Sequence, residues 1–259
     1  MIFIGIDLAW SAANPSAAVA LRWDGKCGRA FLWTGAAKQD EEILQFVGEA
    51  AGPEPALVTI DAPLLVPNAT GTRPCDRELS RAYRWAHAQA YPANRQRLGP
   101  KVRGEVLVEE LTRRGFVHRA EVEKQKPVRQ VVEVFPHPAM VELFGLPHIL
   151  RYKARPDRSY EYRWEELRRY RELLATLDKA EPALAAEDLL GETDPQGQRG
   201  KALKTVENLL DGLCCAYIAL HLWYWGPQGY RCFGDEKTGY ILVPVKPKRT
   251  DYEQAKTDK

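Results

Sequence analysis

The sequence has no excess of charge of either sign and no long apolar run. Its 259 residues include 37 Lys and Arg against 35 Asp and Glu, which gives a formal net charge of +2. This balance excludes a polybasic nucleic-acid coat protein and an acidic tail protein, although a local basic patch remains compatible with binding nucleic acid. No apolar stretch approaches the ~20 residues that span a membrane, so we expect no membrane partner.

Cysteines are few and poorly spaced for covalent or metal cross-links. An odd count without any Cys-x-x-Cys pair argues against a disulfide framework and against a zinc site. We therefore expect reduced, mostly buried thiols. The chain begins Met1-Ile-Phe-Ile-Gly-Ile-Asp, which lacks the charged region of a signal peptide. Together these features predict a cytoplasmic protein. The five cysteines are Cys27, Cys75, Cys214, Cys215 and Cys232.

The order of the predicted elements is typical of an α/β layer fold with a mixed sheet. Apolar runs on both faces predict central strands, and Asp24-Gly25 between two such runs predicts a hairpin. Helices are predicted from apolar residues at helical spacing. The predicted strands cover residues 2–8, 17–23, 29–34, 56–60 and 128–135, with two more short strands within 226–244. The predicted helices cover 39–51, 160–179 and 201–225.

The stretch 64–127 differs from the rest because it is rich in Pro, Gly and Arg. Helical segments near 76–87 and 104–115 predict a helical insertion that elaborates the core and does not form a separate domain. We therefore predict one domain over 1–245, followed by a polar C-terminal tail over 246–259. Such a Lys-rich terminal stretch typically frays.

Four acidic residues interrupt apolar segments. Asp7 and Asp61 each follow a buried-type strand, Glu133 lies inside Val-Val-Glu-Val-Phe, and Asp211 interrupts an apolar helix. Acids are rarely buried unless they are paired or bind a metal. Simpler roles are a turn or cap for Asp7 and for Asp61, and a solvent-facing edge position for Glu133. For Asp211 in mid-helix no cap is available.

A hard divalent cation explains the four acids together. Mg²⁺ or Mn²⁺ takes oxygen ligands and needs only a few carboxylates beside substrate oxygens. Two such ions clamp the attacking and leaving oxygens of a phosphodiester displacement. Without metal, four converging acids would repel one another. We therefore predict that Asp7, Asp61, Glu133 and Asp211 are catalytic metal ligands, and that the cofactor is Mg²⁺ or Mn²⁺, as two ions.

Several motifs, in order along nearly the whole chain, resemble one family. That family is domain of unknown function 429, whose members are described as predicted RNase H-like nucleases. The matching motifs are Ile4-Gly-Ile-Asp-Leu-Ala-Trp-Ser, Asn14-Pro-Ser, Ile60-Asp-Ala-Pro-Leu, Arg73-Pro-Cys-Asp-Arg-Glu-Leu, Tyr91-Pro-Ala-Asn, Glu133-Val-Phe-Pro-His-Pro-Ala, Tyr152-Lys153 and Gly239-Tyr-Ile-Leu-Val-Pro.

The resemblance implies an RNase H-like fold, with a five-stranded mixed sheet whose first three strands are antiparallel and with flanking helices in a three-layer α/β/α arrangement. It implies that Asp7 bridges two metals, that Asp61 is the acid after the fourth strand, and that Asp211 is the acid on the last core helix. Glu133 matches the family's own Glu-Val-Phe-Pro motif. The implied activity is metal-dependent hydrolysis of phosphodiester bonds, with nucleic acid as the partner.

Basic and amide residues near these motifs are candidates for substrate binding, because Arg and Lys recognise phosphate. The alternatives are surface charge or an ion pair with Asp76 for the arginines, a solvated helix position for Lys204, and a turn for Asn94. His137, between two prolines, is a candidate general base with a structural role as its alternative. The candidates for substrate binding are Arg73, Arg77, Asn94, Lys153 and Lys204.

Two other functions stay open. Gly-Ile-Asp at the start of a strand before a hairpin also opens ATPases of the actin and sugar-kinase superfamily, but the chain lacks their length and any Gly-x-Gly cluster. A non-catalytic RNase H-like module that binds nucleic acid or protein is the other alternative. The sequence does not select RNA, DNA or a hybrid as substrate, and it leaves the oligomeric state open.

Overall fold

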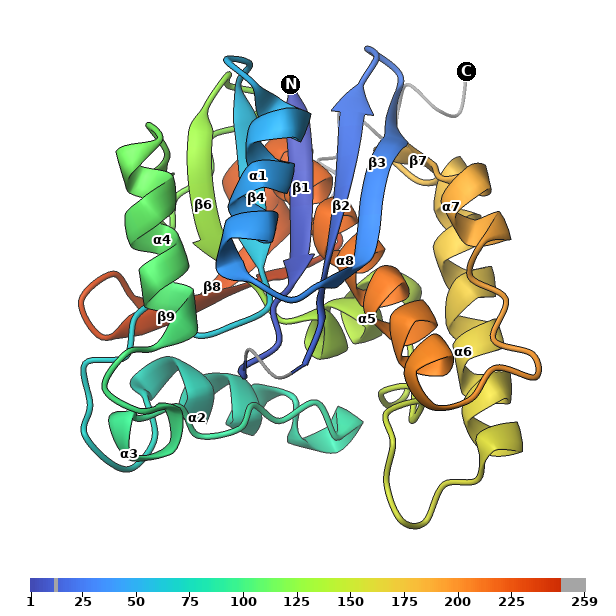
Figure 1. The fold of residues 1–259 in the computed structure, drawn as a ribbon. Helices are drawn as coiled ribbons and strands as arrows, with labels where there is room; N and C mark the ends of the chain where they lie inside the picture. The colour runs from blue at the N-terminus through green and yellow to red at the C-terminus, as the bar shows by residue number, and fades with distance from the viewer. Residues whose placement is uncertain (12–13, 248–259) are drawn as a thin grey trace.

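The computed structural model describes residues 1–11 and 14–247, in which a mixed sheet is covered by helices on both faces (Figure 1). The strands are β1 (Ile2–Asp7), β2 (Ser16–Trp23), β3 (Cys27–Ala37), β4 (Ala56–Ile60), β5 (Val117–His118), β6 (Arg129–Glu133), β7 (Ala183–Ala185), β8 (Tyr230–Asp235) and β9 (Gly239–Pro244). The helices are α1 (Asp40–Ala51), α2 (Pro74–Ala82), α3 (Arg95–Leu98), α4 (Arg103–Arg113), α5 (Pro136–Phe144), α6 (Tyr160–Ala175), α7 (Glu187–Gly191) and α8 (Gly200–Trp225). Short 3-10 helices follow α2, α6 and α8 at Arg84–Ala86, Thr176–Lys179 and Gly226–Gly229.

The main sheet has seven strands in the order β5-β6-β4-β1-β2-β3-β7. The first three strands pair antiparallel, as the sequence predicts, and β1, β4 and β6 run parallel. The predicted number of five strands is wrong, because β5 and β7 extend the two edges of the sheet. These edge strands have two and three residues, too few to show the alternating pattern on which strand prediction depends.

The side chains of β1 alternate between the two faces of the sheet and therefore contribute to two separate hydrophobic cores. Ile2, Ile4 and Ile6 pack with residues of α1 and α4 on one face. Phe3 belongs to the other core, which α5, α6 and α8 cover. The side chains of neighbouring strand residues point to opposite faces of the sheet. Because helices cover both faces, a strand that is apolar at every position is buried on both sides.

Glycine sets how closely α8 approaches the sheet. A Cβ at Gly5 in β1 would lie 2.0 Å from the backbone nitrogen of Ala216 and 2.4 Å from the carbonyl oxygen of Gly212. Both neighbours are helix backbone, which has no room to move. Gly5 therefore allows α8 to lie directly against β1, and this contact places Asp211 beside the end of that strand.

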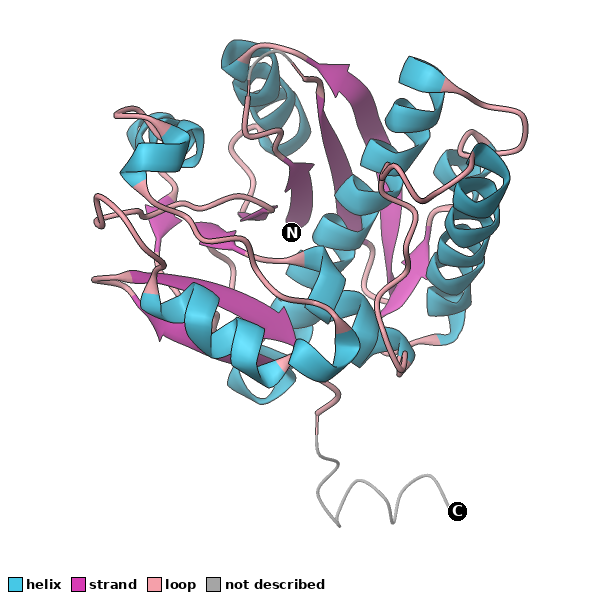
Figure 2. Ribbon diagram, turned by 90° about the horizontal axis from the view of Figure 1, so that it is seen from below, coloured by secondary structure: helices cyan, strands magenta, loops and turns pink. Residues whose placement is uncertain are grey.

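The predicted insertion contains α2, α3, α4 and β5. Helix α2 packs on the β8–β9 hairpin, and α4 packs on α1 and the sheet. Figure 2 shows from below that the hairpin lies apart from the strands of the main sheet. A helix at α5, where the sequence suggested only a break, begins with Pro136; proline is favourable at the first helical position because its fixed φ suits the helix.

None of the described helices is both long and apolar enough to cross a membrane. All five cysteines are free, and Cys75, Cys214 and Cys215 are buried. Of the predicted tail over 246–259, all but residues 246 and 247 lie outside the described residues.

Candidate metal and active site

Asp7 and Asp61 lie side by side at the lower edge of the sheet (Figure 1). The parallel register pairs Ile6 with Ile60, and the backbone nitrogen of Asp61 donates to the carbonyl oxygen of Ile6 at 2.9 Å. Adjacent parallel strands therefore end with one acid each. Both side chains are partly exposed, whereas Ile6 and Ile60 are fully buried. The carboxyl ends of parallel strands are where ligands bind in open α/β sheets.

These two carboxyl groups lack any compensating hydrogen bond from the described residues, and their charge is unfavourable. Desolvation by burial raises the pKa of Asp7 from 3.8 to about 6, although Lys153 opposes the change. Burial, followed by the neighbouring charge of Asp7, raises the pKa of Asp61 well above its usual range. The pair therefore offers oxygen lone pairs to which none of the described residues donates a hydrogen bond.

Asp211 on α8 completes this acidic edge but has partners. Tyr152 Oη donates to one carboxylate oxygen at 2.6 Å, and Lys153 Nζ donates to the other at 2.5 Å. Burial alone would raise the pKa of Asp211, but Lys153 and Tyr152 hold it below its usual value. The same acids raise the pKa of Lys153 despite its burial, so its ammonium group stays charged.

Glu207 is a buried acid that the sequence analysis missed. It lies one helical turn before Asp211, and its carboxylate binds Lys204 at 2.5 Å, Lys153 at 3.3 Å and Arg163 at 3.5 Å. The signal was the same as for Asp211, an acid in a largely apolar helix. Tyr152 was seen only as part of a motif, because nothing in its neighbours indicates a buried hydroxyl group.

Glu133 is held in a different environment, which we call the closed network (Arg73, Asp76, Glu133). Arg73 donates to both oxygens of Glu133, at 2.6 and 3.0 Å, and to both oxygens of Asp76, at 2.8 and 3.1 Å. Glu133 also accepts the backbone N–H of Leu64 at 2.8 Å. All three side chains of the network are nearly inaccessible to solvent, at 1–3% exposed.

The remaining predicted substrate residues lie in several settings. Arg73 has its donors engaged in the closed network, so it would have to leave that network to bind phosphate. Arg77 is exposed and donates to the carbonyl oxygen of Thr72. Asn94 caps α3 by accepting the N–H of Arg97, and its amide donates to Gly71. Lys153 lies at the acidic edge, and Lys204 is directed to Glu207. Whether these residues bind substrate stays a prediction.

His137 lies close to the Asp211 group. Burial, and then the charge of Lys153, lower the pKa of His137 to about 4, so the ring is neutral at pH 7. Its ring packs against Tyr152 and Phe135, and Nδ1 has no hydrogen-bond partner among the described residues. Because this pKa is low and Nδ1 is buried, the ring resists protonation at pH 7, and a general-base role for His137 stays a prediction.

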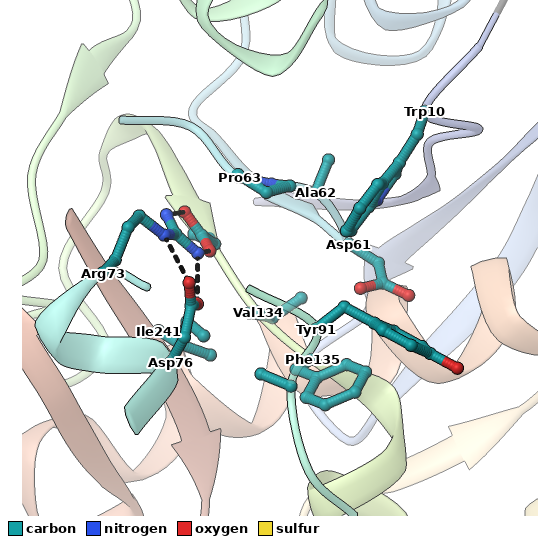
Figure 3. A pocket seen from close by; sticks show the side chains of 12 residues that line it. Trp10, Asp61, Ala62, Pro63, Arg73, Asp76, Tyr91, Val134, Phe135 and Ile241 are labelled. Atoms are coloured by element: carbon teal, nitrogen blue, oxygen red, sulfur yellow. Dashed lines mark hydrogen bonds and ion pairs between the residues drawn. The ribbon is translucent and has the colours of Figure 1, made fainter. Parts of the chain in front are cut away.

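A pocket opens beside Asp61 (Figure 3). The Asp61 carboxylate lies between the rings of Trp10 and Tyr91, and the closed network lies to one side of it. The pocket has a volume of about 60 Å³ and is open to solvent. It is lined by Trp10, Asp61, Ala62, Pro63, Arg73, Asp76, Ala90, Tyr91, Glu133, Val134, Phe135 and Ile241.

The structure thus brings together Asp7, Asp61 and Asp211, whose charges affect one another's pKa values. The charge of Glu133 also raises the pKa of Asp61, but the carboxylate of Glu133 is bonded to Arg73. Within residues 1–11 and 14–247, no group of three or more His, Cys, Asp or Glu side chains has the spacing of a metal site as these side chains stand. The contacts explain this spacing, because Lys153 and Tyr152 direct the carboxylate of Asp211 toward themselves.

Comparison with known families identifies the chain. Residues 5–238 match the family described as Protein of unknown function (DUF429). The chain belongs to this family. The match runs from β1 to the turn before the last strand, so it includes all four acids and the insertion. Comparisons with curated proteins and with solved structures gave no match.

Proposed function

We propose that this DUF429 protein is a metal-dependent nuclease that hydrolyses phosphodiester bonds in nucleic acid. The observation that carries the proposal is the pair of carboxylates, Asp7 and Asp61, on adjacent strand ends beside an open pocket, without hydrogen-bond partners among the described residues. Such an arrangement is costly for folding, and perturbed acids in a pocket are typical of functional sites.

The arrangement of the long strands supports the same proposal. The five longer strands of the main sheet form a mixed sheet whose first three members are antiparallel, with helices on both faces. That is the arrangement implied by an RNase H-like fold. We propose that fold for this family member, with β5 and β7 as additions to the sheet edges.

The donor set fits Mg²⁺ or Mn²⁺. Mg²⁺ binds hard oxygen ligands and is commonly held by one or two carboxylates together with substrate phosphates and water. Asp7 and Asp61 would provide those carboxylates, and Asp211 would add a third on release from Lys153. Bound divalent cations at this edge would supply a water of lowered pKa and charge stabilisation at the leaving oxygen, the chemistry of a two-metal site.

The protein's own groups would prepare the substrate. Lys153 stays charged and is directed to the acidic edge by Asp211 and Glu207, where it can neutralise a phosphate oxygen. We propose that Glu133 acts by position: its bonds to Arg73 and to the N–H of Leu64 hold the loop that begins at Asp61.

The proposed location is the cytoplasm. Free cysteines, three of them buried, suit a reducing compartment in which disulfides do not form. This part of the proposal is independent of the nuclease activity.

The direct test is a cleavage assay with Mn²⁺ on single-stranded RNA, single-stranded DNA, duplex DNA, an RNA–DNA hybrid and a four-way junction. We expect wild-type protein to cleave at least one of these substrates and Asp7→Asn to lose at least 100-fold in rate, since one ligand of the catalytic ions is lost (compare losses of roughly 10–100-fold even for outer-shell partners). Asp24→Asn, an acid in the exposed turn before β3, is the matched control and should keep full activity.

A specific observation favours one alternative, a non-catalytic binding module. Lys153 forms an ion pair with Asp211, so the charge of this acid is neutralised without a metal ion. A site that binds nucleic acid without cleaving it would need no metal ion there. Tight binding to one substrate of the panel without cleavage would support that alternative. Full activity in both Asp7→Asn and Asp211→Asn would refute the proposed site.

A further inference from the structure

The pocket beside Asp61 has an aromatic entrance that the proposed hydrolysis does not use. Trp10 is 48% exposed and Tyr91 is 58% exposed, although both are large apolar side chains. Their rings lie on either side of the Asp61 carboxylate, and Phe135 lies behind Tyr91 (Figure 3). Folding gains little from rings left in water, so their position at a pocket indicates contact with a ligand.

Trp10 extends from a segment that is fixed from two sides. Arg103 donates to the carbonyl oxygen of Ala9 at 2.6 Å, and the N–H of Ala9 donates to Ser16 Oγ at 3.1 Å. Arg103 is itself held by Asp40 at 2.5 Å. These contacts hold Ala9, the residue directly before Trp10, which reduces the entropy that ligand binding must overcome.

Tyr91 is fixed in a similar way from the insertion. The N–H of Ala90 donates to Ser80 Oγ, and the N–H of Ala93 donates to Asp76 of the closed network, each at 3.1 Å. Exposed Arg155 donates to the Tyr91 hydroxyl group. The two rings thus come from distant parts of the chain, and the guanidinium group of Arg155 lies at the hydroxyl group of Tyr91.

The chemistry of this entrance defines the ligand. Two exposed rings favour a planar aromatic group, because ring faces stack and base–aromatic stacking contributes roughly 1–3 kcal/mol per base. Arg155 favours an anionic phosphate next to that group. A planar ring and a phosphate joined together form a nucleotide unit. In a duplex, neighbouring base pairs cover both faces of each base, so only an unpaired base has a face free to stack on one of these rings.

We propose that Trp10 and Tyr91, one on each side of Asp61, form an aromatic clamp in which an exposed ring face stacks an unpaired nucleobase, so that the substrate class of this site is single-stranded nucleic acid. The inference rests on the proposed function for the phosphate at Asp61. Every base has a face that can stack, so the clamp selects unpaired strands and tolerates different sequences.

The test is fluorescence anisotropy of labelled 12-mer single strands of DNA and RNA in buffer with EDTA, where the proposed cleavage does not occur. The comparison ligands are a fully abasic 12-mer with the same phosphates and a 12-bp duplex. Trp10→Ala should weaken binding of the base-bearing strands roughly tenfold, in line with the loss of one stacked base, and should not change binding of the abasic strand. Trp10→Phe, which keeps a ring, should restore most of the affinity.

Trp85→Ala is the matched control, because Trp85 is also exposed, at 60%, but does not line the pocket. It should leave all the affinities unchanged, and circular dichroism of each variant checks folding. The clamp is refuted if Trp10→Ala weakens base-bearing and abasic strands equally, if it weakens neither, or if the wild-type protein binds the duplex as tightly as single strands.

The binding assay in EDTA and the cleavage assay in Mn²⁺, carried out on the same variants, together separate the clamp from the nuclease proposal. Trp10-dependent binding of single strands by a protein that cleaves nothing in Mn²⁺ supports the clamp and refutes the nuclease. Cleavage of single strands that is insensitive to Trp10→Ala supports the nuclease and refutes the clamp.

Discussion

Two groups of acids lie near the same end of the sheet and differ in their hydrogen-bond partners. Asp7 and Asp61, which we call the open pair, accept no hydrogen bond from the described residues, and the pKa of each is raised by burial. Glu133 and Asp76 share the guanidinium group of Arg73, which satisfies all four carboxylate oxygens. The difference is that Arg73 supplies the closed network with a cation, whereas none of the described residues donates a hydrogen bond to the carboxylates of the open pair.

The largest effect should come from opening the closed network. Arg73→Met leaves Glu133 and Asp76 buried without a cation, and breaking a buried ion pair on one side costs about 3–5 kcal/mol. The matched control is Arg22→Met, which removes a partner of Glu54 on the surface, where a pair contributes about 0.2–1 kcal/mol. Urea denaturation measures both changes. Equal losses of unfolding free energy in Arg73→Met and Arg22→Met would contradict the distinction between the buried network and a surface ion pair.

Substitution in the open pair should change the stability of the protein in the opposite direction. Asp7→Asn should stabilise the metal-free protein, because the pKa of Asp7 is about 6 when folded and 3.8 ordinarily. Below pH 3.8 the carboxyl group is neutral in both states and the variant gains nothing. Between pH 3.8 and 6 the unfolded state ionises first, so wild-type stability falls and the advantage of Asn grows to on the order of 3 kcal/mol above pH 6.

Denaturation in EDTA at pH 4 and pH 8 checks this advantage. Asp24→Asn is the control of opposite sign, because two backbone N–H groups lower the pKa of Asp24 to about 2, so its charge is favourable in the folded state. A loss of stability in Asp7→Asn at pH 8 would show that Lys153 already compensates the charge of Asp7.

Asp211 is intermediate between the open pair and the closed network, because it has partners but no arginine. Removing one of these partners should have a smaller effect on stability. Tyr152→Phe removes the hydroxyl group that donates to Asp211 at 2.6 Å but leaves Lys153 in place. We expect a loss of about 1 kcal/mol, the usual contribution of one hydrogen bond, and a rise in the pKa of Asp211 that NMR titration of the carboxyl carbon would detect. No change in either quantity would mean that Lys153 alone satisfies Asp211.

Much of this arrangement could be predicted from the sequence. The apolar strands before Asp7 and Asp61 fix their place at the sheet edge, because parallel neighbours end together. Asp24-Gly25 predicted the hairpin that joins β2 and β3 as antiparallel strands. The structure shows that Gly5 provides the space in which the long helix packs against β1.

The partners of the acids could not be predicted. Arg73 is 60 residues from Glu133 in the sequence, and nothing local shows that a surface-type residue becomes buried between two acids. Lys153 reaches Asp211 from a loop 58 residues earlier. Such long-range pairing depends on how the insertion folds back on the sheet. The edge strands β5 and β7 were missed for a similar reason, since only their neighbours in space make them strands.

The most direct measurement is calorimetric titration of Mn²⁺ into the wild-type protein and into two variants, Asp61→Asn in the open pair and Glu133→Gln in the closed network, with thermal melts to check folding. We predict that Asp61→Asn weakens Mn²⁺ binding at least tenfold (compare the roughly 10–100-fold losses seen for outer-shell partners), whereas Glu133→Gln stays within about threefold of wild type, less than those losses. Unchanged binding in Asp61→Asn together with lost binding in Glu133→Gln would contradict the assignment of the metal to the open pair.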